Sequence, residues 1–214
     1  MRFHGYFRSS SSYRCRIAFN LKRIEPEFVP VHLVKDGGQH RSEAYRELNP
    51  QGLVPTLEVD GAILTQSPAI LEWLDETHPE PPLLPRDPIE RSLVRAFTQV
   101  IACEIHPLQN LRVLQYLKTN YAEEQDGLNA WCQRWIGDGL SACEAHLERY
   151  NKGASFCFGE TPGMADLYLI PQVFSAHRFN VDMSGMPNIK RISAHCETLA
   201  AFADAHPSKQ PDFE

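Results

Sequence analysis

The first eighty residues show short patterns of two kinds. Alternation of apolar and polar positions, bounded by turn residues, predicts strands, and apolar positions three and four apart predict helices. The predicted strands are residues 3–7, 28–33, 54–59 and 62–65, with a hairpin turn at Asp60-Gly61 between the last two. The predicted helices are residues 12–22, 40–48 and 68–77. Pro68 belongs to the first turn of the third helix, so Ser67 is its expected N-cap.

The rest of the chain has a different pattern. Residues 79–88 contain five prolines, which cannot continue a helix and favour extended backbone. Beyond them the apolar spacing is helical over residues 90–117, 125–150, 163–174 and 188–205. Gly163 is the expected N-cap of the third of these, with Asp166 reaching back to it in half of a capping box. We therefore predict an α/β domain over residues 1–80, a proline-rich linker over 81–88 and an all-helical domain over 89–214.

Charge is distributed unevenly along the chain. The 214 residues are 43% hydrophobic and 22% charged, which excludes a disordered or low-complexity chain, and the net charge of −6 argues against a general nucleic-acid-binding surface. Residues 1–23, however, hold six basic side chains and no acid, while the other 191 residues hold 15 basic and 27 acidic side chains. This basic segment is either a targeting leader or a place that handles anions.

Several classes of protein and site are disfavoured. The apolar run at residues 17–21 is too short and interrupted for a signal peptide, and a leader would not need the strand predicted over residues 3–7. No run of about 18 apolar residues could span a membrane. The six cysteines form no Cys-x-x-Cys pair, so neither a metal site nor a dithiol redox centre is expected. We interpret them as core residues of a soluble cytoplasmic protein.

Three motifs could carry chemistry. Residues 8–12 place an arginine and four serines between a strand and a helix, where unpaired N–H groups favour an anion; the simpler interpretation is a turn with Ser11 or Ser12 as N-cap. Val54-Pro55 opens a strand, which indicates an edge or a special geometry such as a cis bond. An edge would leave the Val54 backbone free to pair with a peptide. Gln66-Ser67 precedes the third helix, whose N-terminus could accept a carboxylate or simply be capped.

Together these motifs resemble the cytosolic glutathione transferases. The stretch Ser9-Ser10-Ser11-Ser12-Tyr13-Arg14-Cys15-Arg16-Ile17-Ala18 is similar to the zeta-class signature Ser-Ser-Cys-x-x-Arg-x-Arg-Ile-Ala. Further matches are Asn49-Pro50, Val54-Pro55-Thr56-Leu57, Gln66-Ser67, His106-Pro107-x-x-Asn110, Ala165-Asp166, Pro171-Gln172 and Arg178-Phe179-x-Val181-Asp182. The resemblance covers nearly the whole chain. It implies a thioredoxin-like α/β domain that binds glutathione, an all-α domain that binds the substrate, and a homodimer.

The resemblance also implies an activity, which is glutathione-dependent cis–trans isomerisation of a maleyl keto acid such as maleylacetoacetate or maleylpyruvate. The glutathione thiolate adds to the conjugated double bond, the resulting single bond rotates, and elimination gives the trans product. Lowering a thiol pKa by two units from ~8.5 requires ~2.7 kcal/mol. A hydroxyl bonded to the anion offers ~1.5–3 kcal/mol and a helix N-terminus ~0.3–1 kcal/mol, so no metal is needed.

The family pattern assigns roles to residues of this chain. Ser9 would stabilise the thiolate, with Ser10 beside it, and Ser11 stands where the signature has cysteine, which argues against an obligatory protein thiol. The expected glutathione contacts are His40, Val54, Pro55, Gln66, Ser67, His106 and Asn110. The expected contacts to the dicarboxylate keto acid are Arg8, Arg112 and Arg178, since arginine binds carboxylates in a bidentate way. We expect Arg14 and Arg16 to be structural and to pair with acids.

Three alternatives remain open at this stage. Arg112 is a solvated helix charge or a substrate contact; maleylacetoacetate isomerases often have a small residue there, so its presence favours maleylpyruvate. A broader zeta-class transferase would instead conjugate glutathione to small α-halo acids. A non-catalytic module with the same fold would bind no glutathione, and the set of Ser9, Val54-Pro55 and Gln66-Ser67 argues against it.

Overall fold

A four-stranded mixed sheet organises the first part of the computed structural model, which describes residues 1–214. Its strands are β1 (Arg2–Gly5), β2 (Glu27–Pro30), β3 (Thr56–Val59) and β4 (Ala62–Thr65). They lie in the order β2-β1-β3-β4, with β1 parallel to β2 and antiparallel to β3, and with β3 antiparallel to β4. The predicted succession of strands and helices along residues 1–80 and the thioredoxin-like class are thereby confirmed.

The position of β3 corrects one expectation. β3 is not an edge strand, because it pairs with β1 on one side and β4 on the other. The Val54-Pro55 peptide bond is cis and precedes the strand, so Val54 lies outside the ladder. Of the two alternatives, an edge strand or a special geometry such as a cis bond, the structure has the cis bond.

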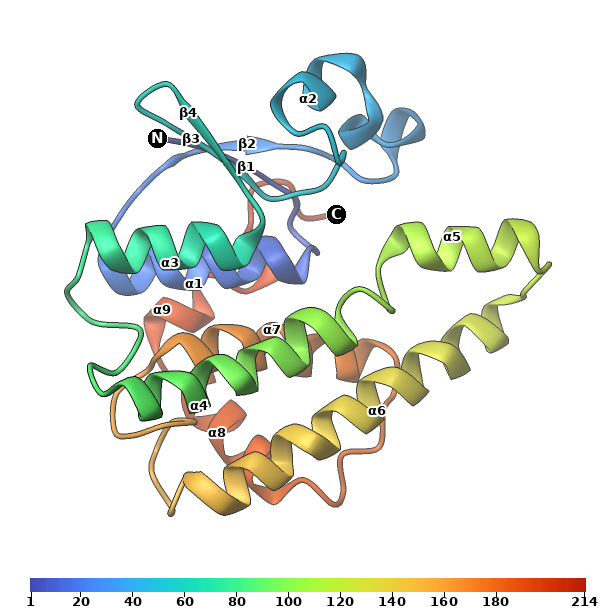
Figure 1. The fold of residues 1–214 in the computed structure, drawn as a ribbon. Helices are drawn as coiled ribbons and strands as arrows, with labels where there is room; N and C mark the ends of the chain where they lie inside the picture. The colour runs from blue at the N-terminus through green and yellow to red at the C-terminus, as the bar shows by residue number, and fades with distance from the viewer. The chain divides into compact units, whose positions relative to one another are not determined.

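Helices cover both faces of this sheet. Figure 1 shows α1 (Ser10–Lys22) and α3 (Ser67–Thr77) side by side on one face and α2 (Glu43–Leu48) on the other. Phe3 and Leu57, paired across β1 and β3, are almost fully buried, and the Phe3 ring packs on the ring of Phe19 in α1. The helix predicted over residues 40–48 is divided into a 3₁₀ turn, Gln39–Arg41, and α2, because the Ser42 hydroxyl accepts the Tyr45 N–H and starts a new helix.

The chain divides into two compact units, and the division differs from the predicted domains. The first unit contains residues 1–82 and 199–214, and the second contains residues 83–198. Residues 199–214 include α9 (Ala200–Ala203) and a 3₁₀ turn, Pro207–Lys209. They pack on α1, where Arg16 Nε donates to the Ala205 carbonyl (3.0 Å) and Asn20 Nδ2 to the Ala201 carbonyl (2.9 Å). These polar contacts, which no local pattern reveals, assign the segment to the first unit.

The second unit is helical throughout. Its helices are α4 (Pro88–Gln99), α5 (Leu111–Asn120), α6 (Gln125–Tyr150), α7 (Met164–Arg178) and α8 (Pro187–Glu197), with a π-helical segment at Val100–Ile105. The predicted α6 is confirmed, and so are Gly163 as N-cap of α7 and the bond from its N–H to the Asp166 carboxylate (2.8 Å). None of the helices is both long and apolar enough to cross a membrane.

The single long helix predicted over residues 90–117 is broken. The His106 N–H donates to the Ile101 carbonyl five residues back, which widens the helix into a π turn. Pro107 follows, and its ring cannot continue the helix. The widened turn packs closely on α6, since a Cβ added at Gly139 would lie only 2.2 Å from Ile105 Cγ1.

Candidate active site

Ser9 begins α1 and supplies its N-cap. The Ser9 Oγ accepts the Ser12 N–H at 3.2 Å, and the residue is partly exposed. Ser12, one of the two caps expected from sequence, instead accepts the Tyr6 N–H at 3.4 Å and is fully buried. Because the Ser9 oxygen is the acceptor in the cap, its hydroxyl proton remains able to donate to an anion beside the helix N-terminus.

The neighbours of Ser9 differ from it in exposure. Ser10 and Ser11 lie in the first turn of α1 and are buried, at 8% exposure each. Arg8 is exposed, and its guanidinium lies 5.9 Å from the ring centres of Tyr6 and Phe7. Ser9 is thus the serine of this run best placed to meet a ligand, with Arg8 directly before it.

No protein thiol competes for this role. Cys15 is fully buried in α1, and burial raises its pKa to about 12. All six cysteines are free, and only Cys103 is exposed. No group of three or more His, Cys, Asp or Glu side chains is arranged to hold a metal ion. The nucleophile that this site could stabilise would therefore come with a ligand.

Two distant residues hold the turn between β1 and α1. Arg16 Nη2 donates to the Phe7 carbonyl (3.0 Å), while Asp212 Oδ2 accepts the Phe7 N–H (2.9 Å). Arg16 donates its hydrogen bonds to the carbonyls of Tyr6, Phe7 and Ala205, and the acid with which it interacts electrostatically is Asp212. Both backbone polar groups of Phe7, the N–H and the carbonyl, are therefore hydrogen-bonded, which holds the turn before Ser9 in place.

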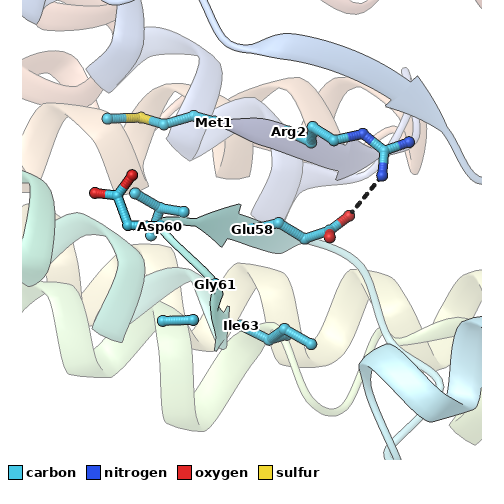
Figure 2. A pocket seen from close by; sticks show the side chains of 8 residues that line it. Met1, Arg2, Glu58, Asp60, Gly61 and Ile63 are labelled. Carbon is cyan, nitrogen blue, oxygen red and sulfur yellow. Dashed lines mark hydrogen bonds and ion pairs between the residues drawn. The ribbon is translucent and has the colours of Figure 1, made fainter.

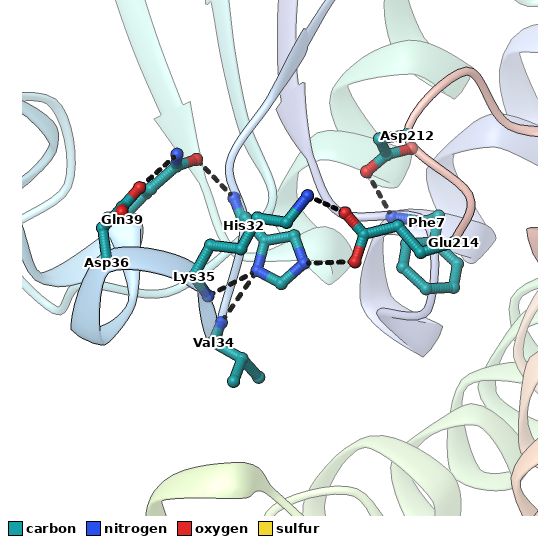
Figure 3. Close-up of polar contacts among 8 residues, drawn as sticks. All are labelled: Phe7, His32, Val34, Lys35, Asp36, Gln39, Asp212 and Glu214. Atoms are coloured by element: carbon teal, nitrogen blue, oxygen red, sulfur yellow. Dashed lines mark hydrogen bonds and ion pairs between the residues drawn. The ribbon is translucent and has the colours of Figure 1, made fainter.

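Residues 211–214 fasten this turn to the loop after β2, as Figure 3 shows. The Glu214 carboxylate pairs with His32 Nε2 (3.4 Å) and with the Lys35 ammonium. His32 Nδ1 accepts the N–H groups of Val34 (3.0 Å) and Lys35 (2.8 Å), so the ring proton lies on the nitrogen that faces Glu214.

His40 follows this loop and is a buried ring with an orphaned nitrogen. It is 7% exposed, and its Nδ1 has no hydrogen-bond partner. Burial, reinforced by the positive charge of Arg41, lowers its pKa. The ring is therefore neutral near pH 7, and it can serve a ligand as a hydrogen-bonding group but not as a cation.

Substitution of His40 separates its polar role from its charge. We expect His40→Ala to raise the KM for glutathione about two- to tenfold, because one hydrogen bond is lost, and His40→Gln to stay near wild type. An unchanged KM in His40→Ala would exclude the contact.

The lowered pKa of His40 also affects stability, because the imidazole of the unfolded chain takes up its proton at a higher pH than the imidazole of the folded chain. Stability should therefore fall as the pH drops below about 6.5, and less so in His40→Gln, as urea unfolding at two pH values would measure.

Val54 and Gln66 are predicted contacts at the ends of β3 and β4. Val54 is half-buried and lies before the cis proline Pro55, with its backbone outside the ladder. Gln66 is exposed, and its φ of 68° is strained for a residue other than glycine, as is frequent at binding sites. Its Nε2 donates to Gln51 Oε1 at 2.5 Å.

Ser67 corrects a second expectation. It is the first residue of α3 and not its N-cap, a position that Gln66 occupies without a side-chain cap bond. The Ser67 hydroxyl instead accepts a hydrogen bond from Arg14 Nη1 at 3.3 Å. The structure therefore joins α1, which Ser9 opens, to the N-terminus of α3.

The remaining predicted residues belong to the second unit. Asn110 is the N-cap of α5, with its Oδ1 accepting the N–H of Arg112 (3.1 Å), and the Arg112 side chain is exposed. His106 is partly exposed at the end of the π turn. Arg178 ends α7, exposed, with its guanidinium 5.0 Å from the Phe179 ring centre.

A set of partly buried polar contacts links the segments that carry these residues, and the sequence analysis did not predict it. Gln109 Nε2 donates to Gln172 Oε1 (2.8 Å), and Trp131 Nε1 donates to the Leu108 carbonyl (2.8 Å). Gln133 Nε2 donates to the Phe179 carbonyl next to Arg178 (2.9 Å). The only sequence signal for this network was the Pro171-Gln172 match, which gave no partner. The contacts tie the loop of His106 and the end of α7 to α6.

A pocket of the first unit is lined by other residues. Figure 2 shows this cavity of about 290 Å³ beside the β3–β4 turn, with the Arg2–Glu58 ion pair (3.2 Å) at its side. Its lining residues are Met1, Arg2, Glu58, Val59, Asp60, Gly61, Ala62 and Ile63. None of them is a predicted site residue, so we assign this cavity no role.

Comparisons with known proteins identify the family to which the chain belongs. Residues 3–82 match the family model described as glutathione S-transferase, N-terminal domain. A maleylpyruvate isomerase of Ralstonia sp is 45% identical over 212 residues, covering 99% of each chain. A maleylacetoacetate isomerase of Pseudomonas aeruginosa is 44% identical over 213 residues, covering 99% of this chain and 98% of the relative.

Solved structures agree with this over the full length. The holo structure of a maleylpyruvate isomerase, described as a bacterial glutathione transferase of the zeta class, has a TM-score of 0.97 at 45% identity, and each chain is fully covered. A maleylacetoacetate isomerase from Methylobacterium extorquens, with bound malonate and glutathione, has a TM-score of 0.94 at 38% identity, again with full coverage of both chains. The chain belongs to the zeta class of the glutathione transferase family.

Proposed function

We propose that this protein catalyses the glutathione-dependent cis–trans isomerisation of a maleyl keto acid. The observation that carries the proposal is the cap of α1, where Ser9 accepts the Ser12 N–H and keeps its own proton to donate. Relatives that match the whole chain are named for this reaction. Glutathione supplies a thiolate that adds reversibly to the conjugated double bond and is recovered when the trans product leaves.

The described residues fit the parts of glutathione. We assign the thiol to Ser9, with Ser10 and Ser11 behind it in the first turn of α1. We assign the γ-glutamyl end to Gln66 and Ser67. The backbone of the cysteinyl residue pairs with Val54, and Pro55 fixes the position of Val54. The buried, orphaned nitrogen of His40 suits the glycyl end. His106 and Asn110 complete the set from the second unit.

The protein then contributes to the reaction mainly by electrostatic stabilisation of the thiolate and of the substrate carboxylates. The Ser9 hydroxyl and the N-terminus of α1 favour the charged form of the thiol, and their combined ~2–4 kcal/mol is enough to lower its pKa by about one to two units. Arg8 and Arg178 are exposed guanidinium groups suited to the two carboxylates of the substrate. A dicarboxylate, malonate, is bound in the Methylobacterium relative.

The experiment that tests the proposal follows the fate of glutathione. Purified protein is incubated with maleylacetoacetate and, separately, with maleylpyruvate, and the fumaryl product and free glutathione are both quantified. We expect many turnovers of product with glutathione recovered in full. Loss of glutathione into a stable thioether, seen by mass spectrometry, would instead indicate the transferase alternative with small α-halo acids.

Arg112 offers a test of substrate preference. We propose that it binds the far carboxylate of maleylpyruvate, which needs a nearer cation because this substrate is shorter. Arg112→Ala should then lower kcat/KM for maleylpyruvate about 10- to 100-fold, because a charge-assisted hydrogen bond is lost, and affect maleylacetoacetate much less. Lys118→Ala, also an exposed cation on α5, is the matched control and should change neither. Equal losses on both substrates would refute a discriminating role.

Assembly and location form the last part of the proposal. The family resemblance favours a homodimer, which light scattering of the purified protein would detect. The six free thiols suit a reducing compartment, and we place the protein in the cytoplasm.

A further inference from the structure

We propose that Asp212 is a positioning residue, which holds the Ser9 hydroxyl in place for the thiol of glutathione by acting through the backbone of Phe7. The inference rests on the proposed function, because it takes Ser9 to be the donor to the thiolate. Asp212 stands 205 residues from Phe7 in the sequence, so no local motif points to it.

The turn before Ser9 has a central residue that needs partners from elsewhere. The Ser9 N–H donates to the Tyr6 carbonyl at 3.0 Å, which closes a turn with Phe7 and Arg8 at its centre. The hydrogen bond that closes such a turn leaves the polar groups of the first central residue unused, and a buried backbone group needs a partner. Phe7 is buried, and its partners are side chains of α1 and of residues 211–214.

Both of these partners are charged. Asp212 Oδ2 accepts the Phe7 N–H at 2.9 Å (Figure 3), and Arg16 Nη2 donates to the Phe7 carbonyl at 3.0 Å. Hydrogen bonds to an ionised group are roughly twice as strong as those between neutral groups. The carboxylate and the guanidinium also attract each other, and the burial of Asp212 Oδ1 strengthens this attraction. Phe7 is therefore held on both sides by a mutually attracting pair.

The two residues after Asp212 anchor it in this position. The Phe213 ring meets the Phe7 ring edge-on, with 5.5 Å between the ring centres. The Glu214 carboxylate pairs with His32 Nε2 (3.4 Å) and with the Lys35 ammonium, as Figure 3 shows. The Asp212 carboxylate is thus kept beside the turn by contacts that do not depend on its own hydrogen bond.

The position of the turn decides where the Ser9 hydroxyl lies. Ser9 precedes the first helical residue of α1, with an extended backbone (φ −69°, ψ 118°), and Arg8 alone separates it from Phe7. A movement of Phe7 is therefore passed on to Ser9. Misplacement of a reacting group by about 1 Å can cost about 100-fold in rate, so a donor to a thiolate has to be held firmly.

The test measures the pKa of the glutathione thiol bound to the full chain, from the pH dependence of the ultraviolet absorbance of the thiolate. It also measures kcat/KM for a maleyl keto acid. We expect Asp212→Ala to raise the pKa of the bound thiol by about half to one unit and to lower kcat/KM about 3- to 10-fold. Asp212→Asn keeps an acceptor oxygen for the Phe7 N–H, so its kcat/KM should stay within about twofold of wild type.

Asn20→Ala is the matched control. The Asn20 Nδ2 donates to the Ala201 carbonyl at 2.9 Å, so this variant also removes one hydrogen bond between α1 and residues 199–214. That bond lies near the end of α1, away from Ser9. We expect Asn20→Ala to leave the pKa of the bound thiol and kcat/KM unchanged, whatever it does to stability.

The outcomes are separable. If Asp212→Ala does not fold, Glu214→Lys decides, since it changes an exposed side chain and turns the attraction to Lys35 into repulsion. It should raise the pKa of the bound thiol and lower kcat/KM about two- to threefold. A wild-type pKa in the deciding variant, an equal change in Asn20→Ala, or an equal loss in Asp212→Asn and Asp212→Ala would overturn the role of Asp212 alone. A wild-type complex whose thiol keeps the pKa of free glutathione would overturn the proposed function as well.

Discussion

Replacing Ser9 by alanine should lower kcat/KM for the maleyl substrate about 10²- to 10³-fold. The reason is the loss of the hydroxyl that we propose as the donor to the thiolate, and the effect has the size seen when one donor to a developing anion is removed. The pKa of bound glutathione should rise by about one to two units, so the pH at which the rate reaches half its maximum should rise with it. Initial rates between pH 5.5 and 9 would measure both.

A control is needed because Ser9 is also an N-cap. Its loss should cost ~1 kcal/mol of stability whatever its chemical role. Asp87→Ala removes the cap of α4, where the carboxylate accepts the N–H groups of Ile89 and Glu90 at 2.9 Å each. That variant should lose similar stability and keep its rate. If Ser9→Ala kept the wild-type rate and pH profile, the serine would be a cap and nothing more.

The largest effect on stability is expected from Asp166→Asn. The Asp166 carboxylate is 1% exposed and accepts two backbone N–H groups, those of Gly163 (2.8 Å) and Cys157 (2.9 Å). Burial raises its pKa, and these N–H donors act in the opposite direction by stabilising the charged form. An asparagine has only one acceptor oxygen, so one N–H would face an NH₂ group in the interior.

We expect this change to lower the free energy of unfolding by about 2–4 kcal/mol. For a chain of this length, that corresponds to a fall in Tm of about 5–15 °C. Differential scanning calorimetry would measure it, with Asp182→Asn as control, because the Asp182 carboxylate accepts the N–H of Ser184 (2.8 Å) at the exposed surface. A Tm within 2 °C of that control would show that Asp166 contributes little to the start of α7.

Local patterns were enough to predict most of the elements. The hairpin turn at Asp60-Gly61 has positive φ at both residues, which is the geometry that this residue pair favours. The apolar spacing of residues 125–150 predicted α6 to its last residue. These features depend on neighbours in sequence, so a single sequence contains them.

The errors arose where distant parts of the chain decide. The helical pattern of residues 90–117 continues through Pro107, and only the packing of Ile105 on Gly139 shows where the helix widens. Residues 199–214 have a helical pattern that suits either unit, and the hydrogen bonds of Arg16 and Asn20 assign them to the first.

In the candidate site, too, some features depend on neighbours in sequence and others on contacts between distant residues. Ser9, Gln66 and Ser67 were predicted as site residues from recognisable motifs, and the structure places each of them at a helix N-terminus. Arg14 and Arg16 belong to one motif and look alike in sequence, yet one donates to Ser67 and the other to backbone carbonyls. Their partners lie on other elements, so spacing could not separate their roles.

We propose that this chain activates glutathione for a reaction in which glutathione is not consumed. The most direct measurement is the initial rate of isomerisation of a maleyl keto acid by the purified protein, with and without glutathione. The account predicts that the rate saturates with glutathione and falls to the uncatalysed background when glutathione is omitted. An equal rate in its absence would contradict the account, because no thiol of the protein is placed to replace it.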